Sequence, residues 1–144
     1  MTDTKYDPDN IFAKILRGEM PSVMVHEDDA TFVFMDIMPR ADGHTLVIPK
    51  TPARNMLDAS PEQLSACLAT VQKIGRAAMS AFDADGLTVQ QFNESAGGQV
   101  VFHLHYHVLP RHDGVQLRPH TGDMADMSVL NAHAEKLRAA LGDM

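Results

Sequence analysis

The run from Val100 to Pro110 places a histidine at every second position, at His103, His105 and His107. Because side chains alternate between the two faces of a β-strand, a strand here would direct all three imidazoles to one face. Aromatic and β-branched residues between the histidines favour a strand over a helix, which would scatter the imidazoles around its circumference. The opposite face would be apolar, formed by Phe102, Leu104, Tyr106 and Val108. The run therefore predicts a rigid strip that presents three nitrogen bases to one place.

Three histidines on one strand suit either a metal site or nucleophilic catalysis. Imidazole is a common zinc ligand, but same-face neighbours on a strand lie about 7 Å apart, too far for three to converge on one ion with bonds of about 2 Å. In nucleophilic catalysis a neutral imidazole attacks phosphorus or an acyl carbon while its neighbours orient it and move protons. A structural role remains the third interpretation, and it is the one we expect for the scattered histidines, His26, His112, His120 and His133.

The length and charge of the chain restrict its class. A chain of 144 residues without linkers or repeats predicts a single domain over residues 1–144. A net charge of -7 argues against nucleic acid as a partner, since phosphate backbones require a basic surface. The single cysteine, Cys67, excludes an internal disulfide and a thiolate metal cage. No apolar stretch has the length of a signal peptide core or a membrane span, so we expect a cytoplasmic protein without a membrane partner.

Short strand patterns and amphipathic helices alternate along the chain. Asp7 and Pro8 suggest the start of a short first helix, and Ser60-Pro61-Glu62-Gln63 is a strong start signal for the longest helix. We expect strands at 23–27, 31–36, 44–49, 86–93 and 102–109, and a last helix at about 127–141. Hairpin-prone strands beside two main helices predict an α+β domain with an antiparallel sheet.

The loop from Asn93 to Gln99 lies immediately upstream of the histidines. Gly97 and Gly98 allow the backbone to approach a ligand closely, and exposed N–H groups there would attract an anion. Asn93 and Gln99 add neutral donors for phosphate or hydroxyl oxygens. A loop of this composition beside imidazoles indicates phosphate chemistry more than a metal site.

The segment Gly98-Gln-Val-Val-Phe-His103-Leu-His105-Tyr-His107-Val-Leu-Pro-Arg111 closely resembles the signature of the histidine-triad (HIT) nucleotide-binding family. Two further segments, at 10–21 and 27–37, resemble the opening of its Hint-like branch, and His44-Thr-Leu-Val-Ile-Pro49-Lys50 also matches. The resemblance covers residues from about 10 to 112, so residues 113–144 form a C-terminal extension of unassigned role.

The resemblance implies a five-stranded antiparallel sheet with two main helices, paired as a homodimer through a continuous sheet. It also implies an enzyme, a purine nucleotide hydrolase or transferase acting at the α-phosphate without a cofactor. His105 would be the nucleophile that forms a nucleotidyl-histidine intermediate, with His103 and His107 assisting. His44 matches the fourth histidine of the family, behind the triad.

The nucleotide pocket is carried over from the family in the same way. Asp36 matches the carboxylate that holds the ribose hydroxyls. The base pocket is matched by Ile11, Phe12, Ile15, Phe34 and Ile37. The phosphate cradle is matched by Asn93, Gly98, Gln99 and Val100. Ordinary core packing is the alternative for the apolar members of this set.

Two positions depart from the family pattern. Some relatives bind zinc through Cys-x-x-Cys near the first helix, where this chain has Asn10 and Ala13, so we expect no structural zinc. Many Hint-like proteins have a serine beside the leaving group where this chain has Val100, which has no proton to donate. Adenosine 5′-phosphoramidates are the expected substrates. A dinucleoside polyphosphate hydrolase, and a nucleotide-binding regulatory or scaffold protein with vestigial catalysis, remain the alternatives.

Overall fold

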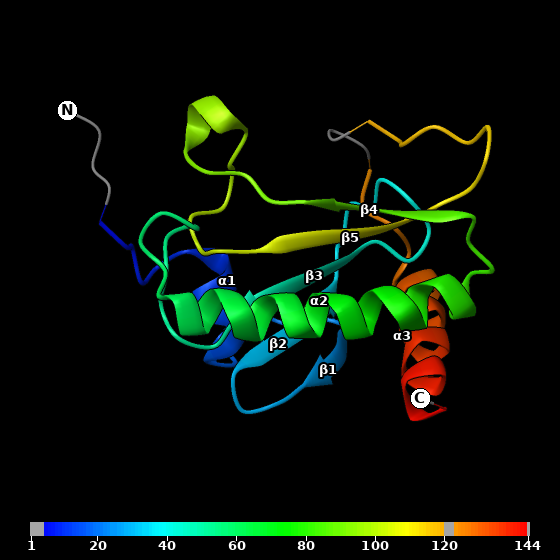
Figure 1. Cartoon of the computed structure of the whole chain (residues 1–144), viewed down its shortest axis with the longest axis horizontal. Coiled ribbons are helices and arrows are strands. Elements are labelled where there is room, and N and C mark those ends of the chain that lie inside the picture. Colours follow the sequence, from blue (N-terminus) through cyan, green and yellow to red (C-terminus); the bar gives the residue numbers. More distant parts are fainter. Residues whose placement is uncertain (1–4, 120–122, 144) are drawn as a thin grey trace.

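A computed structural model describes residues 5–119 and 123–143 as an antiparallel sheet with helices on both faces (Figure 1). The five strands lie in the order β1-β2-β3-β5-β4. Their bounds are Met24–Glu27, Thr31–Met35, Thr45–Pro49, Gly86–Gln90 for β4 and Tyr106–Arg111 for β5. The helices are α1 (Ile11–Leu16), α2 (Pro61–Ala81) and α3 (Met127–Gly142), with a short 3₁₀ helix η1 at Ser95–Gly97. The α+β class, the five-stranded antiparallel sheet and the two main helices are thus confirmed.

The two faces of the sheet bury different side chains because the strands alternate with period two. Val33, Met35 and Val47 point toward α2 and α3 in the larger core. Phe34, Leu46 and Ile48 point to the other face, where they pack with Phe12 of α1. Figure 1 shows α2 crossing the front of the sheet with α1 behind it. His107 pairs across the ladder with Leu46, so its side chain belongs to the α1 face.

The main helices begin and end close to the predicted positions. The Ser60 hydroxyl accepts the backbone N–H of Gln63, and the Gln63 side chain accepts the Ser60 N–H, which completes a capping box at the start of α2. Helix α3 begins at Met127 as predicted, and its buried stripe of Leu130, Ala134 and Leu137 joins the larger core.

Asp7 does not cap the first helix, so that prediction was wrong. Asn10 is the N-cap, and its side-chain oxygen accepts the backbone N–H of Ala13 at 2.9 Å. The Asp7 carboxylate instead accepts the Asp9 N–H at 2.9 Å and supports a turn that precedes α1.

The strand that carries the histidines begins later than predicted. β5 starts at Tyr106, so His103 and His105 lie before the strand and only His107 lies within it. The ladder with β3 ends at the pair Val47 and Tyr106. Beyond that pair the carbonyl of Pro49 accepts the His103 ring, and Leu104 donates its N–H to Ala53 at 2.8 Å. Side-chain and loop partners therefore replace the ladder at the first two histidines. β4 is likewise shorter than predicted, ending at Gln90.

Within residues 5–119 and 123–143, no helix is both long enough and apolar enough to cross a membrane. His120, for which we expect a structural role, lies outside the described residues.

Gly43 tests how tightly the loop before β3 is held. Its φ is +85°, and a Cβ there would lie 2.5 Å from the ring of Phe82 at the end of α2. We expect Gly43→Ala to lower the free energy of unfolding by about 3 kcal/mol, through the left-handed backbone and the overlap. Urea denaturation measures this change. Gly142→Ala is the matched control, because no atom lies within 4 Å of its Cβ position and its φ is not positive. Equal stabilities for the two variants would contradict this packing.

Candidate active site

A cleft of about 400 Å³ opens on the α1 face of the sheet. Its polar side chains are Asp36, His105 and His107, and the rest of the lining is apolar or glycine. The other lining residues are Ile11, Phe12, Ile15, Met20, Pro21, Phe34, Met35, Ile37, Met38, Leu46, Phe92, Gly98, Val100, Val101 and Met124. A larger hollow of about 520 Å³ beside the outer ends of β4 and β5 contains none of the triad histidines. The first cleft is therefore the candidate active site.

Most of the predicted site residues meet in this cleft. The lining includes ten of them: Ile11, Phe12, Ile15, Phe34, Asp36, Ile37, Gly98, Val100, His105 and His107. Four do not line it: His44, Asn93, Gln99 and His103. These four are buried or partly buried next to lining residues, and each makes hydrogen bonds within the protein.

His105 is held by its own main chain. Its Nδ1 donates to the carbonyl of His103 at 2.6 Å, and its ring packs edge-on against Phe12 with the centroids 4.9 Å apart. Since Nδ1 carries the proton, Nε2 of the neutral ring holds a lone pair. Burial lowers the pKa of His105, and the His103 carbonyl partly offsets this effect. The neutral, nucleophilic form therefore predominates at pH 7.

His103 is fully buried and is anchored at both ring nitrogens. Its Nε2 donates to the Pro49 carbonyl at 2.9 Å, so Nδ1 accepts from the Tyr6 hydroxyl at 2.7 Å. Burial lowers the pKa of His103 to about 4. This ring is thus a neutral anchor, and it fixes the main-chain carbonyl that orients His105. Tyr6 was not anticipated from the sequence, because it lies in a polar segment with no periodic pattern.

His107 is oriented by His44 behind it. The backbone N–H of Arg40 donates to Nδ1 of His44 at 3.1 Å, so Nε2 of His44 carries the proton. That nitrogen donates to Nδ1 of His107 at 2.9 Å. His107 is therefore protonated at Nε2, the nitrogen that can donate to a ligand in the cleft. This relay places complementary functions side by side, with an acceptor on His105 and a donor on His107, whose ring centroids are 5.0 Å apart.

Asp36 lies at the end of β2, where the chain turns away from the sheet. One carboxylate oxygen accepts the Met38 N–H at 2.8 Å, and the other lies 3.5 Å from Nε2 of His44. Asp36, His44 and His107 form the one group of three potential metal ligands within the described parts of the chain. A cation there would compete with the Arg40 N–H and the shared proton, because His44 cannot accept at Nδ1 and ligate through Nε2 while remaining a neutral imidazole. The hydrogen bonds favour a proton relay over an ion.

The loop from Asn93 to Gln99 is shaped by contacts that could not be predicted from the sequence. Glu94 has a φ of +64°, which is rare for a residue with a side chain. Its carboxylate accepts Nε and Nη2 of Arg54 at 2.8 and 2.9 Å and the Asn55 amide at 2.6 Å. The Arg54 guanidinium also lies 4.2 Å from the centroid of the Phe102 ring. The pKa of Glu94 is lowered chiefly by the hydrogen bond from Arg54. An ion pair thus holds the entry to η1.

Gln99 and Asn93 fasten this loop to its surroundings. The Gln99 amide donates to the carbonyls of Arg54 and Val101, and its oxygen accepts from the Glu94 backbone and from Asn55. The oxygen of Asn93 accepts the N–H of Met56 at 2.9 Å. Gly98 follows η1 with a φ of +101° and lines the cleft. The two amides thus position the loop that carries Gly98 and Val100.

Comparison with known proteins shows which family the chain resembles in sequence and in fold. The model of the HIT domain matches residues 17–114. The "Protein hit" of Bacillus subtilis is 41% identical over 71% of this chain and 70% of its own length. An adenylylsulfatase of Arabidopsis thaliana is 36% identical over 72% of this chain and 52% of its own length.

A solved structure agrees with the fold throughout. A Hit-like protein from Bartonella henselae, described as involved in cell-cycle regulation and crystallised with an unknown ligand, superposes with a TM-score of 0.90 at 51% identity. The match covers 94% of this chain and 98% of that one, so the part of this chain beyond the HIT-domain match also has a structural counterpart.

Because burial lowers the pKa of several histidines, we expect the folded protein to lose stability in acid. The unfolded chain protonates His103 near its ordinary pKa of 6.5, whereas the folded state does so only at about 4. The unfolded state therefore binds more protons in this window, and stability falls as the pH falls through it. We expect His103 alone to remove about 2 kcal/mol between pH 7 and pH 5. Burial also lowers the pKa of His133 and His105, which adds in the same direction.

Urea unfolding at the two pH values measures the loss of stability, and NMR titration assigns it. The ring resonances of His103 should stay those of the neutral form down to about pH 5. A His103 titration midpoint near 6.5, or stability that is equal at pH 7 and pH 5, would contradict this anchor.

Proposed function

Because the chain belongs to the HIT family, we propose that it is a hydrolase or transferase that cleaves purine nucleotide conjugates of the adenosine 5′-phosphoramidate type at the α-phosphate. The observation that carries this proposal is the pairing of His105 and His107 in the cleft. One ring presents a lone pair and the other a proton, and hydrogen bonds behind the two rings fix both states. This pairing suits attack on phosphorus next to a group that must be stabilised as it leaves.

The first step is attack by Nε2 of His105 on the α-phosphorus. An N–P bond forms and the bond from phosphorus to the leaving group breaks. The imidazole becomes positively charged, and the His103 carbonyl that accepts its Nδ1–H stabilises this charge. The leaving group takes up the Nε2 proton of His107 as it departs, while Nε2–H of His44 stays hydrogen-bonded to Nδ1 of His107. Water then attacks phosphorus, the N–P bond to His105 breaks, and the proton that the water loses returns to Nε2 of His107. The nucleoside monophosphate is released and both histidines regain their starting states.

The rest of the nucleotide follows the cleft. Asp36 accepts the ribose hydroxyls, and the α-phosphate lies against the backbone of Gly98. Phe12 and Phe34 offer aromatic surface to the base. Asn93 and Gln99 act on the phosphate through the loop that they fasten.

We also propose that the protein works in the cytoplasm as a homodimer with a continuous sheet. β4 is an outer strand that pairs only with β5 among the described strands. Val89 on β4 is 47% exposed and Leu68 on α2 is 53% exposed, and a second copy would cover both.

An adenylylsulfate conjugate is a second candidate substrate, favoured by Val100. This side chain is 68% exposed at the cleft and cannot donate a proton. Sulfate leaves as a stable anion without a proton, whereas an amine requires one. The Arabidopsis relative is named an adenylylsulfatase, which supports the same candidate.

His105→Asn tests the nucleophile. We expect the variant to fold, bind AMP and lose at least about 1000-fold in kcat, because the attacking nitrogen is gone. Wild-type enzyme quenched in alkaline denaturant, which preserves the N–P bond, should carry one nucleotidyl group by mass spectrometry, and the variant none. His133→Asn is the control, since His133 lies on α3 outside the cleft. Retained turnover in His105→Asn, with the control active, would refute the mechanism.

Val100→Ser tests the preference for the leaving group. A hydroxyl at this position supplies the donor that valine lacks, so the ratio of kcat/KM for the phosphoramidate to that for adenylylsulfate should rise about tenfold or more. Steady-state kinetics on both substrates give the ratio. An unchanged ratio would remove Val100 from the handling of the leaving group.

A further inference from the structure

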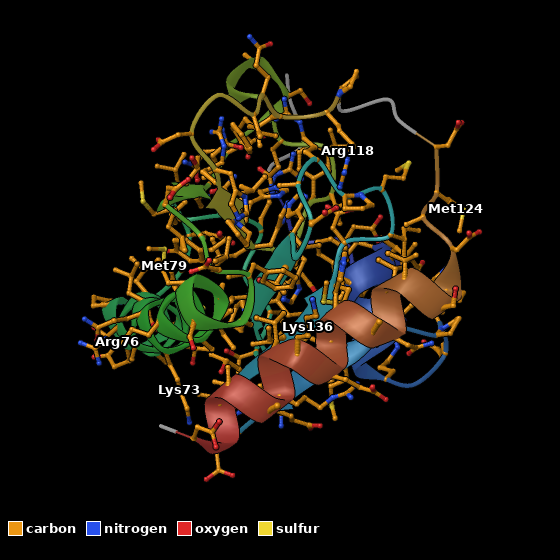
Figure 2. All side chains as sticks on the ribbon, turned by 90° about the vertical axis from the view of Figure 1, so that its right-hand side faces the viewer. Lys73, Arg76, Met79, Arg118, Met124 and Lys136 are labelled. Carbon is orange, nitrogen blue, oxygen red and sulfur yellow. The ribbon has the colours of Figure 1, made fainter. Side chains whose placement is uncertain are left out.

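The segment that follows β5 returns to the cleft. Its described residues, 112–119 and 123–126, lie between the end of β5 at Arg111 and the start of α3 at Met127, and Arg118 and Ala125 bond to the loop between β2 and β3. Figure 2 labels two of its residues, Arg118 and Met124. Met124 lines the cleft, although it lies beyond the HIT-domain match at residues 17–114.

Arg118 fastens one side of this segment to the loop. Its backbone N–H donates to the Arg40 carbonyl at 2.8 Å, and Nε of Arg40 donates to the Arg118 carbonyl at 2.9 Å. The Arg118 guanidinium donates to the Pro39 carbonyl and to the Asp42 carboxylate, both at 3.1 Å. The loop so engaged is the one that connects Asp36 to His44, and the Arg40 N–H holds His44.

A second attachment places Met124. The backbone N–H of Ala125 donates to the carbonyl of Ile37 at 3.0 Å, directly after Asp36 in the chain. Met124 remains 64% exposed, because its side chain borders the cleft instead of filling the core. Two further methionines border the cleft, and their exposed fractions are similar, 40% for Met20 and 41% for Met38.

Three partly exposed methionines around one apolar cleft require an explanation in terms of a ligand. Thioether side chains adapt their shape to a partner and make favourable contacts with aromatic rings. Exposed apolar side chains that converge on a cavity are typical of a surface that a ligand covers.

We infer that Met124, delivered by the C-terminal segment, completes the base subsite, and that Met20, Met38 and Met124 form a methionine rim around the purine ring. This inference rests on the proposed nucleotide function, which it deepens. It also gives the C-terminal extension a role in substrate binding.

The rim also sets the expected selectivity. The side chains of the cleft that can accept or donate strongly are Asp36, His105 and His107, and the proposed mechanism uses these on ribose and phosphate. Apolar contacts discriminate between rings only weakly compared with buried hydrogen bonds. AMP and GMP should therefore bind within about tenfold of each other, while loss of the base should weaken binding strongly.

Methyl NMR with ¹³C-labelled methionine tests the rim directly. Saturation with AMP should shift the methyl resonances of Met20, Met38 and Met124 through the ring current of the base, and leave those of Met79 and Met127 in place. Ribose 5-phosphate, which lacks the base, should not reproduce these shifts. An unmoved Met124 methyl in protein that binds AMP would overturn the rim and leave the proposed function standing. Failure of the wild-type protein to bind AMP at all would overturn both.

Met124→Ala provides the matched affinity measurement. We expect its Kd for AMP and for GMP to rise about five- to tenfold, because apolar contact with the base is lost, and its Kd for ribose 5-phosphate to stay within twofold. Met127→Ala is the control, since Met127 is 52% exposed at the start of α3 and does not line the cleft. Equal losses for AMP and ribose 5-phosphate, or no loss for AMP, would overturn the inference.

Discussion

The hydrogen bond from Nδ1 of His105 to the carbonyl of His103 is the interaction on which the site depends. It joins a side chain to the main chain two residues earlier, so it holds only if the backbone at His103 is fixed. The ring of His103 supplies that fixation through Pro49 at the end of β3 and through Tyr6 in the N-terminal segment. The buried, neutral ring of His103 thus holds the backbone carbonyl that keeps the proton of His105 on Nδ1. The same principle operates at His107, where His44 takes its proton state from the Arg40 backbone.

The sheet provides the frame, and the loops provide the chemistry. Alternation along β2 and β3 leaves one face to α2 and α3 and the other to α1 and the cleft. Apart from His107, which lies within β5, the functional groups lie just beyond the ends of regular elements, where the backbone can leave the ladder. Asp36 follows β2, His105 precedes β5, and the Glu94 carboxylate, clamped by Arg54, shapes the turn before Gly98. Rigid elements with functional residues at their ends combine stability with a defined site.

The features that could be predicted from the sequence are those that depend on hydrophobic periodicity and on local helix and turn signals. The capping box at Ser60, the hairpin before Asp36, the start of α3 at Met127 and the α+β class all depend on such signals and were confirmed. The cap at Asp7 and the strand start at Phe102 were wrong, because Asn10 and the Pro49 carbonyl are competing partners that no local pattern reveals. The same limit concealed Tyr6, Arg54 and Glu94, whose contacts span roughly 40 residues or more of sequence. The predicted site residues other than His44, Asn93, Gln99 and His103 line one cleft. They could be named from the sequence because the resemblance to a family relates residues that are far apart in the chain, which spacing alone does not.

The proposed mechanism depends on the proton positions of two histidines, and long-range ¹H–¹⁵N NMR of the histidine rings at pH 7 measures these positions directly. We predict that His105 is neutral with its proton on Nδ1, and that His107 carries its proton on Nε2 with Nδ1 as the acceptor. Assignment follows from the His105→Asn and His107→Asn variants, each of which removes one of the eight sets of histidine ring signals. A His105 ring protonated at Nε2, or charged at pH 7, would contradict the account, because the attacking lone pair would then be absent from the cleft.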